Sequence, residues 1–367
     1  MLIALVAATL LAFLAAQALP RVFSMAPAFW AHLVLAVGVM TLITAAMQHF
    51  VPVLARTRGA GRWTARLPWL MAGAGGVLEG VLAGGLDFTW VSLAAGLALG
   101  GVVWMLLWMQ ARARQSLGRP HAGLYWYVAA MGCLALGLVA ACLMPFFPGW
   151  LPELRAFHWH INLYGFVGLT AVGTLQVLMP TAAARADPQA GARLRVDLKW
   201  AVAAALSIAV GQAVAPPLSL LGVALWGWVV GRMLLAWWRL HRERLLVLHG
   251  AEPVLLAAVA GLVMALLGGV LDDARLGPLT VFFPAFLMPL VTGAAGVLVP
   301  VWLNPSQPAL QGDGRRVLNR WGGVRALLFL SAGGLPLLGY QCAGMPALMA
   351  LFWFGAIFVL WLYRTEN

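Results

Sequence analysis

Apolar runs of about twenty residues follow one another along almost the whole chain, and this pattern restricts the fold more than any other feature. The run LIALVAATLLAFLAAQAL near the amino end is one example. Of the 367 residues, 63% are hydrophobic and only 9% are charged, so a water-soluble domain of this size could not keep its surface hydrated. We therefore expect lipid to be the solvent for most of the surface.

Windows of spanning length predict about twelve transmembrane helices, and hence an all-α polytopic membrane protein with one transmembrane domain over 1–367. The windows lie at 2–19, 30–54, 68–87, 88–111, 122–147, 156–183, 200–218, 219–238, 252–271, 278–303, 325–342 and 345–363. The first window is interpreted as a helix and not as a secretory signal, because no basic residue precedes it and no small-residue cleavage site follows.

Basic residues gather in alternate connections between these windows. They are Arg56, Arg58, Arg62 and Arg66; Arg112, Arg114 and Arg119; Arg185, Arg193, Arg195 and Lys199; Arg239, Arg242 and Arg244; Arg315, Arg316, Arg320 and Arg325; and Arg364. The opposite connections hold only Arg21, Arg155 and Arg275. The positive-inside rule then places both termini on the cytoplasmic side of a bacterial inner membrane. This topology also accounts for the net charge of +12 without nucleic acid as a partner.

Two of the windows share a pattern of polar residues and proline, and a third window matches it in part. His32, Gln48 and Pro52 in AHLVLAVGVMTLITAAMQHFVPV recur with the same spacing as His160, Gln176 and Pro180 in WHINLYGFVGLTAVGTLQVLMPT. The segment LTVFFPAFLMPLVTGAAGVLVPV aligns Gly293 and Pro300 with the second copy but has Thr280 at the histidine position. The spacing predicts three pseudo-repeats of four helices, at roughly 1–120, 121–245 and 246–367.

Three four-helix units with histidines near the outer ends of the second and sixth helices resemble subunit I of the haem-copper oxidase superfamily. The string FHWHINLYGFVGLTAVGTLQVLMP is also similar to a helix of the nitric-oxide-response NnrS proteins of that wider group. The resemblance implies a b-type haem, with His32 as an axial ligand and His158 or His160 at the position of the helix-six histidine. The windows 200–218 and 278–303 contain no histidine, so the ligands of an oxygen-reducing centre are missing and oxidase activity is not expected.

The three histidines near the outer surface are the candidate cofactor ligands, because an imidazole at that depth must be paired, hydrated or bound. Residues two apart on a helix point about 200° away from each other, so His158 and His160 cannot both face one iron. We favour His32 and His160 as a bis-histidine haem site, with His158 as a supporting contact and Arg155 as the cation for the haem propionates. The same three histidines could instead bind copper.

Glu79 lies near the middle of the window 68–87, where a carboxyl group must be neutral, paired or hydrated. It is a candidate for proton handling, with a hydrogen-bonded structural carboxyl as the alternative.

The leading hypothesis for function is a haem b membrane protein that transfers electrons with quinol or a respiratory-complex partner, or that responds to or detoxifies nitric oxide. One alternative is a trafficking or transport protein for copper or haem. Another is a cofactor-free assembly subunit of a respiratory complex. The sequence leaves open whether the chain is a membrane oxidoreductase, but no hydrolase or phosphoryl-transfer motif is present.

Overall fold

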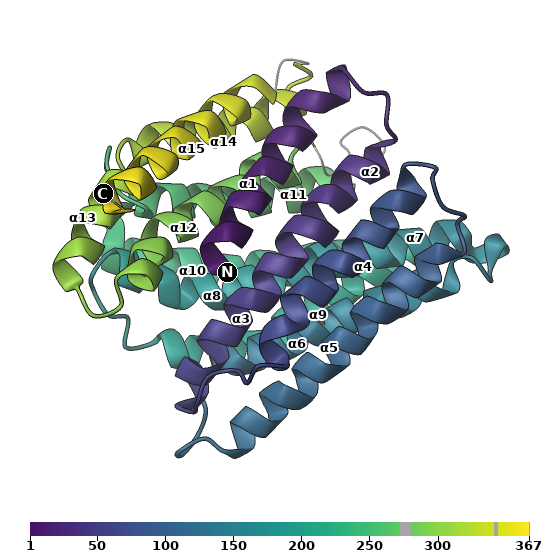
Figure 1. Cartoon of the computed structure of the whole chain (residues 1–367), viewed down its shortest axis with the longest axis horizontal. Helices are drawn as coiled ribbons and strands as arrows, with labels where there is room; N and C mark the ends of the chain where they lie inside the picture. Colours follow the sequence, from purple (N-terminus) through teal and green to yellow (C-terminus); the bar gives the residue numbers. More distant parts are fainter. Residues whose placement is uncertain (272–279, 341–343, 367) are drawn as a thin grey trace. The chain divides into compact units, whose positions relative to one another are not determined.

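The computed structural model describes residues 1–271, 280–340 and 344–366, and within these ranges all regular secondary structure is helical (Figure 1). Helices satisfy their own backbone hydrogen bonds, which a lipid environment requires. The α-helices are α1 (Leu2–Ala18), α2 (Pro27–His32), α3 (Met40–Ala55), α4 (Leu67–Leu82), α5 (Trp90–Arg114), α6 (Gly123–Leu143), α7 (Leu151–His160), α8 (Gly168–Ala182), α9 (Ala190–Val214), α10 (Pro216–Leu245), α11 (Glu252–Leu271), α12 (Met288–Leu303), α13 (Pro308–Leu318), α14 (Gly322–Leu337) and α15 (Gly344–Glu366). The 3-10 segments are η1 (Leu19–Arg21), η3 (Thr64–Arg66) and η4 (Pro148–Trp150), and the π-helical segments are η2 (Leu33–Val39), η5 (Ile161–Val167) and η6 (Phe282–Leu287).

Seven helical stretches of the described chain are long and apolar enough to cross a membrane. They are Pro27–Ala55, Trp90–Arg114, Gly123–Leu143, Pro148–Ala182, Pro216–Leu245, Phe282–Leu303 and Gly344–Arg364. Shorter apolar helices cover Leu2–Ala18, Glu252–Gly268 and Gly322–Leu337. The structure is thus that of a polytopic helical membrane protein, whereas the number of twelve spans stays a prediction.

Several helices continue beyond the apolar windows into segments that the sequence assigned to basic connections. The helix α9 begins at Ala190 and so includes Arg193, Arg195 and Lys199, and α10 extends through Arg244. Arg325 lies inside α14 and is buried, so it does not belong to the preceding connection. Long basic side chains lower the apolar count of a window without breaking the helix, which is why hydropathy alone misplaced these ends.

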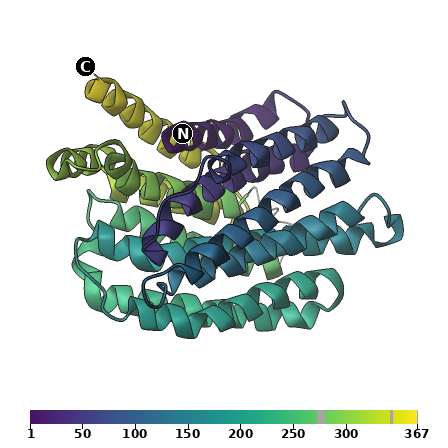
Figure 2. The same cartoon turned by 60° about the horizontal axis from the view of Figure 1, so that its bottom comes forward.

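Two compact units make up the chain, and the first comprises Met1–Ala12, Phe23–Thr174 and Pro188–Val229. Within this unit α5 packs along α4 and α6, and α6 also packs along α7 and η5 (Figures 1 and 2). The indole Nε1 of Trp126 in α6 donates a hydrogen bond to the Leu194 carbonyl oxygen of α9 at 2.9 Å.

Glycines permit close helix approaches in the first unit. A Cβ on Gly165 of η5 would lie 2.7 Å from the Cys133 Cβ of α6, and a Cβ on Gly75 of α4 would lie 3.1 Å from the Ala36 carbonyl of η2. Small residues at such crossings are typical of helices that associate within membranes, because they bring the backbones into contact. These contacts fix the two π-helical segments against their neighbours.

The second unit comprises Phe13–Val22, Leu175–Asp187 and Val230–Asn367. In its described part, α11 packs against η6, α12 and α14, and α14 packs against α15 (Figure 1). A Cβ on Gly261 of α11 would overlap the Ala285 carbonyl oxygen of η6, so the two backbones touch at that point.

Each of the three matched sequence segments contains a π-helical turn, which the sequence did not predict. The segments η2 and η5 begin directly after His32 and His160, and η6 lies in the third copy. Further along, Pro52, Pro180 and Pro300 lie inside α3, α8 and α12. π-helical turns are rare and are frequent at functional sites. The relation of the three segments by a four-helix repeat stays a prediction.

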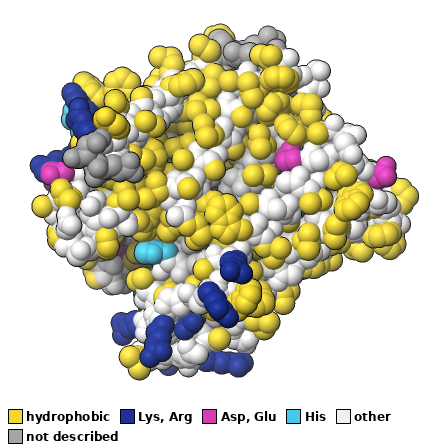
Figure 3. Space-filling model, in the orientation of Figure 1, with side chains coloured by type: hydrophobic (Ala, Val, Ile, Leu, Met, Phe, Trp, Pro, Cys, Tyr) yellow, Lys and Arg dark blue, Asp and Glu magenta, His cyan; other side chains and the backbone are white. Residues whose placement is uncertain are grey.

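Apolar side chains cover much of the visible face, and Lys and Arg side chains gather where α3 and α5 end (Figure 3). In the connection between α3 and α4, the guanidinium carbons of Arg62 and Arg66 lie 5.2 and 4.9 Å from the ring centroid of Trp63. Exposed apolar helices with a basic and aromatic border are typical of contact with a lipid bilayer.

Candidate cofactor site

His32 is the last residue of α2 and directly precedes the π-helical segment η2. Its ring is half-buried, and its Nδ1 lies 2.8 Å from the Ala28 carbonyl oxygen one turn earlier. A carbonyl oxygen can only accept, so Nδ1 carries the hydrogen and donates it. In the neutral ring, Nε2 then has the lone pair that a metal ion can bind.

His158 on α7 has the same arrangement with a different partner. Its ring is half-buried, and its Nδ1 lies 2.8 Å from the Gly137 carbonyl oxygen of α6. By the same reasoning Nδ1 donates and Nε2 has the lone pair. A second-shell carbonyl that holds one ring nitrogen is the usual support of a histidine ligand to a metal.

The rings of His32 and His158 face each other in the first unit. Their centroids lie 6.1 Å apart, and their planes differ by 20°. Two imidazoles that bind one metal ion from opposite sides, at N–metal distances of about 2 Å, place their centroids roughly 6 Å apart. The centroid separation therefore matches that of two ligands to a single metal ion.

His160 repeats the local geometry of His32 but lies against another residue. Its side chain is buried, its Nδ1 donates to the Ala156 carbonyl oxygen at 2.8 Å, and it directly precedes η5 as His32 precedes η2. Its ring centroid lies 6.2 Å from that of Tyr164. As the helical spacing predicts, His158 and His160 have different neighbours, and the residue whose ring is next to His32 is His158. The ligand and supporting roles expected for these two residues are therefore exchanged in our proposal.

Asn162 and Gly137 form the packing behind His158. The Asn162 Nδ2 donates to the His158 carbonyl oxygen at 2.8 Å and lies 3.3 Å from the His158 Nδ1. A Cβ on Gly137 would lie 2.6 Å from that same Nδ2, so no other residue fits between α6 and η5 without moving the amide. Sequence reasoning missed both residues, because a glycine or an asparagine in an apolar window carries no signal of which histidine it will support.

Arg155 is exposed on α7, about one turn before His158, and is near enough to His32 for the two groups to interact electrostatically. A guanidinium at the edge of a histidine pair can bind the carboxylates of a haem through charge-assisted hydrogen bonds. Trp30 of α2, two residues before His32, is buried. Its indole nitrogen has no hydrogen-bond partner within the described chain.

Glu79 lies on α4, half-buried, and its two carboxyl oxygens are buried without a hydrogen-bond partner among the residues that the structure describes. No hydrogen bond or ion pair in that part of the chain joins it to the histidine pair. Its position keeps proton handling as a candidate role and gives no support for a structural hydrogen bond to a neighbouring helix.

The histidine pair supplies two imidazole donors. In the described ranges, no group of three or more His, Cys, Asp or Glu side chains could hold a metal. Cys142 instead exchanges contacts with Ser92 of α5: the Ser92 Oγ donates to the Cys142 carbonyl at 2.8 Å, and the Cys142 Sγ lies 3.7 Å from the Ser92 carbonyl. Haem brings four ring nitrogens of its own and needs only axial ligands, which two imidazoles provide.

Comparison of the chain with protein-family models, with curated proteins and with solved structures finds no match. The functional argument therefore depends on the geometry of the histidine pair.

Proposed function

We propose that this protein is a haem b-binding integral membrane protein in which His32 and His158 are the axial ligands. The observation that carries the proposal is the pairing of two half-buried rings at 6.1 Å, each held at Nδ1 by a backbone carbonyl oxygen. In each neutral ring, Nε2 then has the lone pair that would bind the iron. Backbone carbonyl groups orient the two rings, and Arg155 would bind a haem propionate.

Electron transfer is the activity that this arrangement favours, with quinol or a respiratory-complex protein as the electron partner. When bound, a haem supplies one-electron redox chemistry. Two imidazoles held on one haem iron would leave no ligand position free for nitric oxide. Nitric oxide response or detoxification is therefore the less favoured form of the same proposal, and oxygen reduction is not part of it.

For the architecture, we propose about twelve spans in three pseudo-repeats, with a fold like that of haem-copper oxidase subunit I. Support comes from η2, η5 and η6, which occupy matching places in the three similar segments, and from the shared internal prolines. The alternation of basic connections supports a bacterial inner-membrane protein with both termini in the cytoplasm.

A second candidate is a trafficking protein for copper or haem, in which the histidines bind the cargo transiently. The observation that favours it is Glu79, a carboxyl group with no hydrogen-bond partner in the described chain, because such a group is suited to line a polar path through a membrane. Less than one cofactor per chain, together with accumulation of metal or haem in vesicles, would support this candidate.

The test is purification in mild detergent, followed by visible spectra of the oxidised and reduced protein and by iron and copper analysis. We expect about one haem per chain. His32→Ala and His158→Ala should each abolish it, whereas His160→Ala should keep it because the ring of His160 packs beside Tyr164. Copper without haem, or haem that survives both His32→Ala and His158→Ala, would refute the assignment.

A further inference from the structure

Arg325 in the second unit is a buried cation whose N–H donors have no acceptor among the described residues. It lies in the first turn of α14, its residue is 1% exposed, and its Nε, Nη1 and Nη2 atoms have no hydrogen-bond acceptor within the described chain. A guanidinium has five N–H donors and does not lose its proton in proteins. A buried charge of this kind is destabilising unless an anion or several acceptors satisfy it.

The backbone at the start of α14, which carries Arg325, is held by close contacts with another loop. A Cβ on Gly322 would overlap the Gly250 carbonyl oxygen, and the Gly323 N–H donates to the Leu248 carbonyl at 3.0 Å. The Gly250 N–H donates to the Asn319 carbonyl at 3.0 Å. Peptide groups of the loop between α10 and α11 thus hold the start of α14 in place.

Phe354 of α15 contacts one flat face of the Arg325 guanidinium but accepts none of its N–H hydrogen bonds. The Arg325 Cζ lies 4.7 Å from the Phe354 ring centroid, which is a cation–π contact. Such a contact uses the flat face of the group, whereas the N–H bonds lie in its plane. Acceptors for the in-plane donors are therefore still required.

We propose that Arg325 binds a phosphate group, which is either inorganic phosphate or the head group of a phospholipid. The planar fork of a guanidinium matches two oxygens of a phosphate and binds them with charge-assisted hydrogen bonds. Arg325 follows a basic stretch that includes Arg315 and Arg320, and such a stretch raises the local concentration of anions. The inference is independent of the histidine pair, because every residue in it belongs to the second unit.

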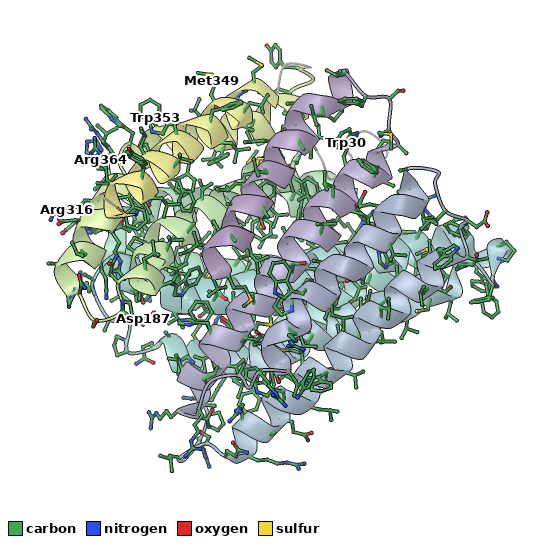
Figure 4. All side chains as sticks on the ribbon, viewed as in Figure 1. Trp30, Asp187, Arg316, Met349, Trp353 and Arg364 are labelled. Carbon is green, nitrogen blue, oxygen red and sulfur yellow. The ribbon has the colours of Figure 1, made fainter. Side chains whose placement is uncertain are left out.

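The experiment measures the thermal unfolding midpoint of the full chain, delipidated in detergent and free of phosphate, during a titration with inorganic phosphate. Chloride at equal ionic strength corrects for general salt effects. Wild type should show a saturable rise in the midpoint, because a ligand that binds only the folded state stabilises it. The rise should be absent in Arg325→Met and smaller in Arg325→Lys, which keeps the charge but not the planar fork. Arg316→Met is the matched control, since Arg316 projects from α13 and is exposed (Figure 4). Its response should equal that of wild type.

A second titration uses a short-chain anionic phospholipid and a short-chain zwitterionic one in place of phosphate. A rise with phospholipid alone that requires Arg325 supports the proposal and identifies a head group as the source. Without any ligand, Arg325→Met should be at least as stable as wild type, because it removes an unpaired buried charge. If ligand-free Arg325→Met instead has a lower unfolding midpoint than wild type, Arg325 is already stabilised by another group of the protein. That result would overturn the proposal. Absence of any Arg325-dependent rise with either ligand would overturn it as well. If Arg325→Met does not fold, the ligand-induced rise in the midpoint is compared between wild type and Arg325→Lys. A smaller rise in Arg325→Lys supports the proposal, and an equal rise overturns it.

Discussion

Replacing Gly137 by alanine should loosen the support of His158, and the effect can be worked out from the contacts at this crossing. The new Cβ would lie 2.6 Å from the Asn162 Nδ2, 2.8 Å from its Oδ1 and 2.9 Å from its Cγ. Real Cβ atoms do not approach other atoms this closely, so the amide must move. The amide is held by its hydrogen bond to the His158 carbonyl at 2.8 Å, and movement breaks that bond.

The free energies of the opposing effects give the expected size. Overpacking costs about 1–3 kcal/mol, and loss of the amide hydrogen bond costs about 1 kcal/mol more. Alanine in place of glycine inside a helix returns about 1 kcal/mol. The net loss of stability is therefore about 1–3 kcal/mol.

The matched control is Gly132→Ala in the same helix, where a Cβ would meet nothing within 4 Å. This variant should gain about 0.5–1 kcal/mol, because only the helix propensity changes. Denaturant unfolding of both variants in detergent, followed by circular dichroism, measures the difference. If the proposed haem is present, Gly137→Ala should also lower its occupancy, whereas Gly132→Ala should not. A Gly137→Ala protein as stable as Gly132→Ala would refute the reasoning.

Two further predictions concern packing in the second unit and pH dependence in the first. Gly261→Ala should be more destabilising than Gly137→Ala, because its Cβ would meet the Ala285 carbonyl, which is backbone and cannot rotate away. Unfolding measurements test this, with Gly355→Ala as the control because a Cβ there would lie in open space. Burial, and to a lesser extent the charge of Arg195, lower the pKa of His121 below its usual 6.5. The unfolded chain therefore takes up this proton first, so stability should fall as the pH drops below about 6.5. His121→Gln should remove that part of the pH dependence, and an unchanged profile would contradict the assignment.

The sequence alone determined the class of the protein and the approximate places of its helices. Repeated apolar runs of spanning length with few charges indicate membrane-embedded helices, because a helix satisfies its own backbone hydrogen bonds where lipid offers no partners. The sequence also singled out His32, His158 and His160, because imidazoles are uncommon in such runs. These conclusions depend on local composition and spacing, which a linear reading contains.

Only the tertiary structure decided which residues meet. His158 lies beside His32 because Gly137 lets α6 approach η5 and its carbonyl holds the ring, and no local pattern encodes that approach. Arg325 belongs by composition to a basic connection, but the packing of α14 against α15 buries it beside Phe354. Burial and pairing depend on contacts between segments far apart in the chain, so spacing along one helix could nominate these side chains but could not assign their partners.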